Sequence, residues 1–224
     1  WVFEETDALR SNVSGDVGKL VRNYTYANPG LLGVEPPTDG AALLAREAIQ
    51  NSWDSALERQ ADESDGECPA FRLEFRFEQL EGSDKEAFVE SAGLVDLAER
   101  AAQLPNDVTA IADPTVFERI EDETHPLRIM RVVETGTTGM YGPFIGQRSK
   151  MSLAMVTVGF TVKRAGLGGS YGQGKVGLIR ASGTRVVFGY SAFAEREDDE
   201  VTRRFLGMTY WSAHSLDGRD FNGW

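Results

Sequence analysis

Residues 41–60, AALLAREAIQNSWDSALERQ, are the stretch from which the fold is predicted. Apolar side chains recur there at three- and four-residue intervals, which predicts a helix with one apolar side. The apolar residues are Leu44, Ala45, Ala48, Ile49, Trp53, Ala56 and Leu57. The polar residues of the opposite side are Glu47, Gln50, Asn51, Asp54 and Glu58. Asparagine is a poor helix-interior residue, and no Lys or Arg stands in this stripe to pair with its carboxylates. A solvated polar face is one interpretation, and a site for a metal ion and a water is the one that we favour.

The whole chain has the size and composition of one large globular domain, with 224 residues, 41% of them hydrophobic. Its formal net charge of −12 argues against a dedicated nucleic-acid-binding surface. The single cysteine, Cys68, excludes an intrachain disulfide and indicates a reducing compartment, so we expect a cytoplasmic protein without a membrane span. We expect an N-terminal arm, residues 1–39, before one domain, residues 40–224. The ends at Trp1 and Trp224 suggest a piece of a longer polypeptide.

Further elements follow from periodicity. Phe and Leu alternate strictly with Arg and Glu over 71–78, which predicts a strand with one buried and one solvated face. Ser83 and Glu86 form a capping-box pattern that predicts a helix over 83–103. Segment 149–163 fits either a helix or a strand. More strands are expected at 127–133, 184–193 and 204–211. This order favours an α/β (α+β) two-layer sandwich, with a mixed, largely antiparallel sheet and helices on one face.

Two glycine-rich segments stand out. The first, ETGTTGM at 134–140, directly follows a predicted strand, and the second, GLGGSYGQGK, occupies 166–175. The second segment fits the P-loop pattern up to Lys175 and then fails, because Val176 stands where a hydroxyl should hold Mg²⁺. A flexible surface loop is the alternative interpretation. The density of glycines favours a loop whose backbone N–H groups close over anionic oxygens.

Together these stretches resemble the Bergerat-fold (GHKL) ATPases, which include gyrase-type topoisomerase subunits, heat-shock chaperones, histidine-kinase catalytic domains and mismatch-repair proteins. EAIQNSWDSA at 47–56 is similar to the family's helix motif. ETGTTGM is similar to its Asp-x-Gly-x-Gly turn, with Glu in place of Asp and one more residue between the glycines. GSYGQG at 169–174 matches the Gly-x-x-Gly-x-Gly of the ATP lid. The resemblance spans residues 40–193 and rests on the order and spacing of the three motifs.

The resemblance implies a Bergerat fold that takes ATP and Mg²⁺, with roles for three residues of the helix. Glu47 corresponds to the catalytic carboxylate that polarises the water attacking the γ-phosphate. Asn51 corresponds to the residue that holds Mg²⁺ through its amide oxygen, and this ion needs few protein ligands because it keeps several waters. Asp54 is expected to order the site without touching the metal.

The same resemblance assigns the glycine segments to ATP. Glu134 stands where an Asp accepts a hydrogen bond from the adenine amino group, so ATP is expected to bind more tightly than GTP. Gly136 and Gly139 would let the backbone approach the base. The residues assigned to the lid around the triphosphate are Gly169, Gly172, Gly174 and Lys175, although the lysine is not a general family feature and has a solvated position as its alternative. No catalytic role is given to the two histidines or the cysteine.

Three functions remain open on the sequence. The first is a Mg²⁺-dependent ATPase module of a larger protein that closes its lid and dimerises or joins a partner subunit, with nucleic acid bound only through other domains. The second is a nucleotide-binding scaffold or sensor with little turnover, which the substitution at Glu134 favours and the intact Glu47 opposes. The third is a histidine-type protein kinase, which the lack of a preceding His-bearing dimerisation helix disfavours.

Overall fold

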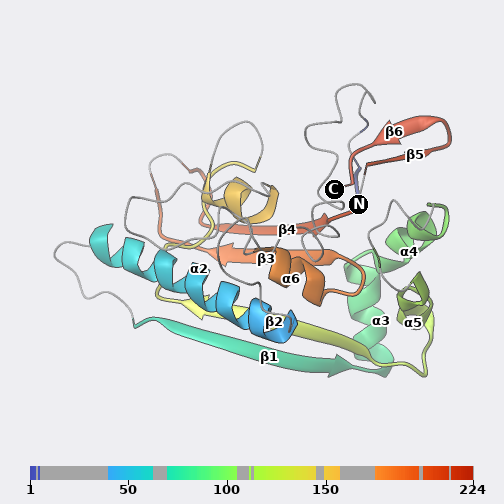
Figure 1. Cartoon of the computed structure of the whole chain (residues 1–224), viewed down its shortest axis with the longest axis horizontal. Coiled ribbons are helices and arrows are strands. Elements are labelled where there is room, and N and C mark those ends of the chain that lie inside the picture. Colours follow the sequence, from blue (N-terminus) through green and yellow to red (C-terminus); the bar gives the residue numbers. More distant parts are fainter. Residues whose placement is uncertain are drawn as a thin grey trace, which may run out of the picture.

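The computed structural model describes residues 1–3, 5, 40–62, 70–104, 111, 114–144, 149–156, 175–196, 199–211 and 213–223. Its helices are α2 (Gly40–Asp62), α3 (Gly82–Ser91), α4 (Leu94–Ala102), α5 (Glu118–Glu121) and α6 (Lys175–Ala181), with a 3-10 turn at Pro114–Val116 and a π-helical turn at Ser152–Val156. Its strands are β1 (Arg72–Leu80), β2 (Leu127–Thr135), β3 (Val186–Ala192), β4 (Arg203–Thr209), β5 (His214–Leu216) and β6 (Arg219–Phe221). In Figure 1, α2 runs along the paired strands β1 and β2, and α3, α4 and α5 gather at one end of the molecule.

The strands form three antiparallel pairs, β1–β2, β3–β4 and β5–β6, and α3, α4 and α5 come between β1 and β2 in the chain. The β1–β2 pair keeps one register throughout, from Arg72 opposite Thr135 to Leu80 opposite Leu127. Within the described ranges, no ladder of hydrogen bonds joins β2 to β3, so each sheet has two strands. The predicted mixture of helices with antiparallel strands is therefore confirmed, whereas one larger sheet is not seen in this part of the chain.

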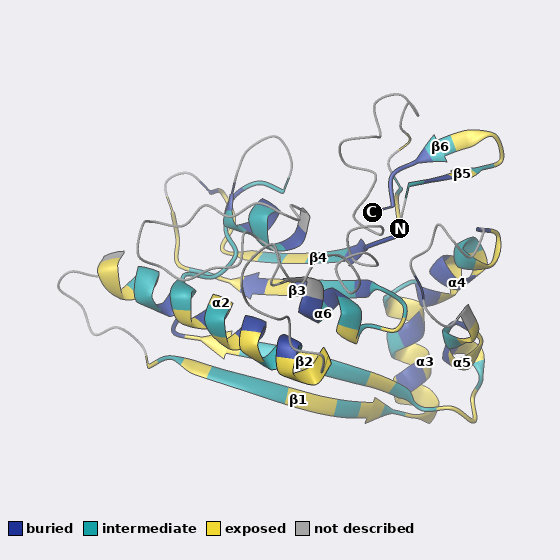
Figure 2. Ribbon diagram, viewed as in Figure 1, coloured by how far each residue is buried: buried dark blue, intermediate teal, exposed yellow. Residues whose placement is uncertain are grey.

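Helix α2 confirms the helix predicted from 41–60, but its buried face is not the predicted one. The buried residues of α2 are Leu43, Glu47, Ala48, Ser52 and Ala56. Ile49 and Trp53, predicted for the apolar side, are 51% and 49% exposed, and Figure 2 shows the buried and exposed bands alternating along the helix. The face of α2 is set by α6, which approaches so closely that a Cβ on Gly177 would lie 3.3 Å from Leu44 Cα.

Strand β1 has the predicted alternation, and its apolar face is covered along part of its length. Phe71, just before the strand, meets the Trp53 ring of α2 edge to face at 5.5 Å. Phe77, six residues later, is 77% exposed. The prediction of a continuous buried face is therefore wrong at Phe77. The opposite face carries pairs of Arg and Glu, such as Arg76 with Glu74 at 2.6 Å.

The helix predicted over 83–103 is interrupted, giving α3 and α4. Gly93 lies between them with φ of 59°, in the left-handed region that favours glycine. Trp1 packs against this break and donates a hydrogen bond from Nε1 to Ala92 O at 2.8 Å. The predicted capping box is wrong, because the residue that precedes α3 is Glu81 and no side chain caps the helix there.

Two apolar clusters form the core. The larger one joins α3, α4 and α5 to the start of β3 around Trp211, which is 0% exposed. The smaller one consists of Met151, Met155, Ile179, Met208 and Tyr210, with Met140 packed against it. Burial raises the pKa of the Tyr210 hydroxyl, which donates a hydrogen bond to Met155 O at 2.6 Å. The second cluster thus contains three of the five methionines of the chain, and a fourth packs against it.

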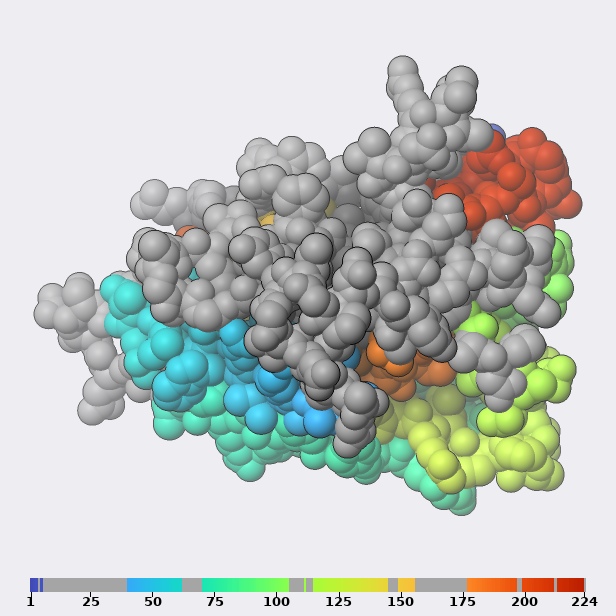
Figure 3. Space-filling view, viewed as in Figure 1, coloured from blue at the N-terminus to red at the C-terminus, as the bar shows by residue number. Residues whose placement is uncertain are grey.

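The first residues of the predicted arm pack on the domain beside β5 and β6, as Figure 1 shows for the two termini. Phe3 stacks on Trp211 with ring centroids 5.5 Å apart, and Glu5 forms a β-bridge with Phe221. Figure 3 shows the β5–β6 hairpin, in red, at one corner of the molecular surface, and α2 lying over β1. None of the helices in the described ranges is long and apolar enough to cross a membrane.

Candidate functional site

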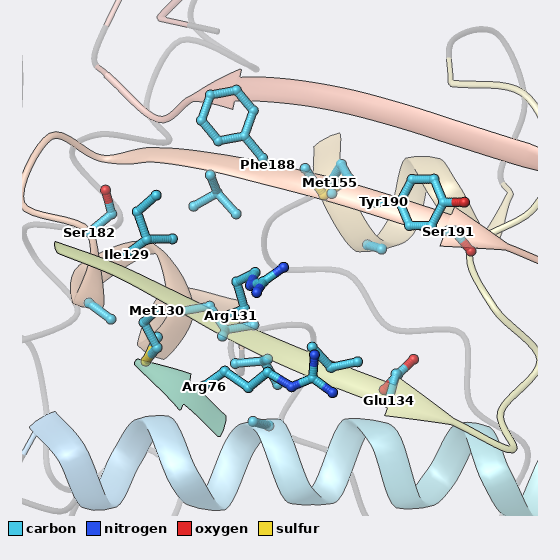
Figure 4. Close-up of a pocket in the computed structure, with 18 of the residues that line it drawn as sticks. Arg76, Ile129, Met130, Arg131, Glu134, Met155, Ser182, Phe188, Tyr190 and Ser191 are labelled. Carbon is cyan, nitrogen blue, oxygen red and sulfur yellow. The ribbon is translucent and has the colours of Figure 1, made fainter. Parts of the chain in front are cut away.

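A cavity of about 2500 Å³ extends from α2 and the turn that follows β2, along β1, β2 and β3, to α3, α5 and α6. Figure 4 shows side chains from β2 and β3 facing one another in it, with Glu134 and Ser191 toward the same end. The predicted site residues that line this cavity are Asn51, Asp54, Glu134, Gly136 and Gly139. The first and second predicted motifs, about 80 residues apart in the sequence, therefore share one cavity.

The turn at 134–140 depends on its two glycines. Gly136 and Gly139 have φ of 76° and 73°, which other residues rarely adopt. A Cβ on Gly139 would also lie 3.1 Å from Phe193 Cβ and from Ser191 Oγ. The Met140 N–H donates a hydrogen bond to Ser191 Oγ at 2.8 Å, so the turn is attached to β3.

The segment after the turn is held by a buried carboxylate. Asp199 Oδ2 accepts a hydrogen bond from Gly142 N at 2.6 Å, and Oδ1 accepts one from Arg204 Nη2 at 2.6 Å. Burial alone would raise the pKa of Asp199, but these hydrogen bonds outweigh it and the pKa is lowered. Because the carboxylate stays ionised, it can keep accepting from both donors.

Helix α2 and the turn are joined directly by polar side chains. Ser55 Oγ and Thr138 Oγ1 are 2.9 Å apart, and Thr138 N donates to Ser55 Oγ at 3.3 Å. Arg59 Nη1 donates to Thr137 O at 3.1 Å. No pattern in the sequence predicts these contacts, because they join residues that are about 80 positions apart.

Glu134 lies at the end of β2, with an exposed side chain. Its Oε1 accepts a hydrogen bond from Thr137 Oγ1 at 3.2 Å. The other oxygen, Oε2, has no hydrogen bond within the described part of the chain. The Glu134 carboxylate is thus oriented by the turn while one acceptor stays open to a ligand.

Asn51 and Asp54 belong to successive turns of α2, the first exposed and the second half-buried. Both are among the residues that line the cavity. The described residues contain no group of three or more His, Cys, Asp or Glu arranged to hold a metal ion. An amide oxygen with a nearby carboxylate suits Mg²⁺, which takes oxygen ligands and completes its shell with waters and phosphate oxygens.

The proposed catalytic carboxylate has a different environment. Glu47 is 1% exposed, and its Oε1 accepts hydrogen bonds from Arg46 Nη2 at 2.7 Å and Arg46 Nε at 3.2 Å. It is not among the residues that line the cavity. The polar side of α2 was predicted to lack a cationic partner for its carboxylates. In the structure Glu58 forms an ion pair with Lys150, which precedes the π-helical turn.

The predicted lid glycines, Gly169, Gly172 and Gly174, lie outside the described residues. Lys175 is the first residue of α6. That helix was not predicted from the sequence, and it packs against the N-terminal part of α2.

The charge of the cavity wall differs from that of the chain. Its described lining contains six Lys and Arg residues against four Asp and Glu residues, although the whole chain has a formal net charge of −12. The basic ones are Arg59, Arg76, Arg119, Arg128, Arg131 and Lys150. Arg131, Lys150 and Arg76 are ion-paired with Glu78, Glu58 and Glu74. Arg59, Arg119 and Arg128 add positive charge to the wall, which favours an anionic ligand.

Comparisons with protein-family models, with curated proteins and with solved structures find no match to this chain. The geometry of the cavity therefore carries the functional conclusion.

Proposed function

We propose that this chain is a Bergerat-type ATPase domain that binds Mg·ATP in the cavity between α2 and the 134–140 turn. One observation carries the proposal: Asn51 and Asp54 of the helix motif line the same cavity as Glu134, Gly136 and Gly139 of the turn motif. Hydrogen bonds between α2 and the turn hold the two motifs together. The two-layer sandwich with helices on one face is part of the same proposal, and the packing of α2 on the β1–β2 strand pair supports it.

The adenine end of the ligand would lie at the turn. Glu134 offers the open acceptor Oε2 to the exocyclic amino group of adenine, whereas guanine has a carbonyl oxygen at that ring position, which would repel a carboxylate. Gly136, with φ of 76°, lets the turn follow Glu134 directly, and it is buried in the structure, so any approach of the base would be to the exposed Glu134 side chain. We therefore expect ATP to bind more tightly than GTP.

The phosphate end would lie toward Asn51, whose amide oxygen would hold Mg²⁺. When bound, this ion would neutralise phosphate charge. The excess of basic over acidic residues in the cavity wall acts in the same direction. The lid formed by Gly169, Gly172 and Gly174, and a phosphate contact of Lys175, remain part of the proposal.

Hydrolysis requires that a carboxylate reach the attacking water, and Glu47 is the candidate. A general base acts within hydrogen-bond distance of the proton that it accepts. Because Glu47 is buried and engaged by Arg46, hydrolysis would require a rearrangement that turns it toward the cavity. This observation favours a second candidate function, a nucleotide-binding scaffold or sensor that uses the same site with little turnover.

Titration calorimetry with ATP and with GTP, each with and without Mg²⁺, tests the binding proposal. We expect Mg²⁺-dependent binding that is tighter for ATP, and loss of that dependence in Asn51→Ala. Equal affinity for the two nucleotides would refute the role of Glu134, and no binding of either would refute the proposal as a whole. Phosphate release measured on the same preparation decides between ATPase and sensor, and light scattering with and without ATP tests nucleotide-driven dimerisation.

A further inference from the structure

Two side chains of α2 fix the part of the turn that lies between its glycines. Ser55 Oγ contacts Thr138 through both the hydroxyl, at 2.9 Å, and the backbone N–H, at 3.3 Å. Arg59 Nη1 adds a hydrogen bond to the carbonyl oxygen of Thr137 at 3.1 Å. Three contacts thus reach two consecutive residues, so the α2 helix defines the conformation of Thr137 and Thr138.

The turn passes this restraint on to the carboxylate at its start. Thr137 is 8% exposed, and its hydroxyl donates to Glu134 Oε1 at 3.2 Å. A solvent-exposed glutamate without such a donor samples many rotamers. With the donor fixed from α2, the second oxygen of Glu134 is held in one direction relative to the helix that carries Asn51.

We propose that Ser55 and Thr138 are positioning residues that orient Glu134 and so determine the preference for a base with a 6-amino group. This inference rests on the proposed binding of ATP. It goes beyond that proposal because it assigns the selectivity to a contact between α2 and the turn, rather than to Glu134 alone.

A positioning role predicts a different result from a purely structural one. If the Ser55–Thr138 contact only stabilised the fold, its loss would lower the melting temperature and weaken the binding of every nucleotide alike. If the contact orients Glu134, its loss weakens the binding of only those ligands that use this carboxylate. Inosine triphosphate is the informative comparison, because it differs from ATP by an oxygen in place of the 6-amino group.

The experiment measures the dissociation constants of ATP and inosine triphosphate, both with Mg²⁺, for wild type and four variants. Thr138→Val and Ser55→Ala remove one hydroxyl each, Thr138→Ser keeps the hydroxyl, and Gln60→Ala changes an exposed α2 residue outside the contact. We expect Thr138→Val and Ser55→Ala to lower the ratio of the inosine triphosphate dissociation constant to the ATP dissociation constant by about three- to tenfold, the range for one lost hydrogen bond. Thr138→Ser and Gln60→Ala should keep the wild-type ratio.

Both nucleotides are titrated into the same preparation, so a partly unfolded sample changes the stoichiometry of both and leaves the ratio intact. Wild-type protein that prefers ATP, together with Thr138→Val and Ser55→Ala proteins that keep the full preference, would overturn the inference while sparing the proposed function. Wild-type protein that binds both ligands equally would overturn the inference together with the role of Glu134, and wild-type protein that binds neither would overturn the proposed function as well. The double variant Ser55→Ala, Thr138→Val should lose no more selectivity than Ser55→Ala alone, because Ser55→Ala already removes both contacts of Ser55 with Thr138.

Discussion

Replacement of Gly139 by alanine, compared with the same replacement at Gly82, tests how the turn of the site is built. Both glycines have positive φ, 73° at Gly139 and 50° at Gly82. They differ in their surroundings. A Cβ on Gly82 would have nothing within 4 Å, whereas one on Gly139 would lie 3.1 Å from Phe193 Cβ and Ser191 Oγ and 3.4 Å from Ala192 O.

The expected magnitudes follow from this difference. A left-handed conformation costs a non-glycine residue about 1–2 kcal/mol. Alanine also reduces the conformational entropy of the unfolded chain, which stabilises the folded protein by about 0.4–1 kcal/mol. Gly82→Ala should therefore lower the free energy of unfolding by about 1 kcal/mol. Gly139→Ala adds the cost of overpacking, about 1–3 kcal/mol, because Phe193 cannot move freely while its N–H donates to Thr202 O at 3.0 Å. Its total loss should be about 2–4 kcal/mol.

Urea unfolding followed by tryptophan fluorescence measures both variants against wild type. Equal losses would show that the neighbours of Gly139 relax and that contact with β3 does not constrain the turn. No loss at Gly139 would refute the left-handed turn itself, and with it the approach of Met140 to Ser191.

Three further results are expected. Lys85 is 4% exposed, and its Nζ donates hydrogen bonds to the carbonyl oxygens of Arg119, Asp122 and His125. Lys85→Met should therefore lower the free energy of unfolding, measured in a urea titration, by about 3 kcal/mol. Hydrogen bonds from the Thr124 hydroxyl and N–H, and from His125, lower the pKa of Asp122 from 3.8 to about 2. Ionised Asp122 therefore stabilises the folded state fully above about pH 4. In urea titrations, the difference in unfolding free energy between wild type and Asp122→Asn should disappear as the pH falls toward 2. Glu47→Gln should leave ATP binding intact and lower turnover by about 10²–10⁴-fold in a phosphate-release assay if Glu47 is the base.

Each of these has a contrary outcome. A stable Lys85→Met protein would mean that water replaces the ammonium group. A stability difference between wild type and Asp122→Asn that does not change between pH 4 and 2 would exclude Asp122 from the acid response. Unchanged phosphate release by Glu47→Gln would assign the base to another residue, and undetectable release by wild type would favour the sensor.

The elements that the sequence predicts well are those with a regular side-chain period, as at 41–60 and 71–78, or with a largely apolar run, as at 127–133. Helix α2 and strands β1 to β4 all appear within a few residues of their predicted limits. The β5–β6 hairpin was missed although its signal was present: Asp217-Gly218, with φ of 51° and 74°, is the dipeptide that favours a two-residue hairpin turn. The break before α4 was missed because Gly93 is required by the packing of Trp1, which is 92 residues away.

The candidate site also has features that the sequence predicts and features that it does not. Glycines at the turn are predictable, because a strand followed by Gly136 and Gly139 indicates positive φ. The buried face of α2 is not, because the neighbouring helix that determines it comes 130 residues later and has Gly177 at the contact. The environment of Glu47 also depends on that rotation, so its burial beside Arg46 escaped the periodicity argument.

The two core clusters differ in how readily they deform. The cluster around Trp211 is made of branched aliphatic and aromatic side chains, which have few rotamers and fix the end formed by α3, α4 and α5. The methionine cluster borders the cavity, and thioether side chains with three rotatable bonds fill space in many shapes at similar energy. The wall beneath the turn can therefore adapt its shape to an occupant while the opposite end of the molecule stays rigid. Plasticity in this protein is a property of side-chain chemistry at one end of its core.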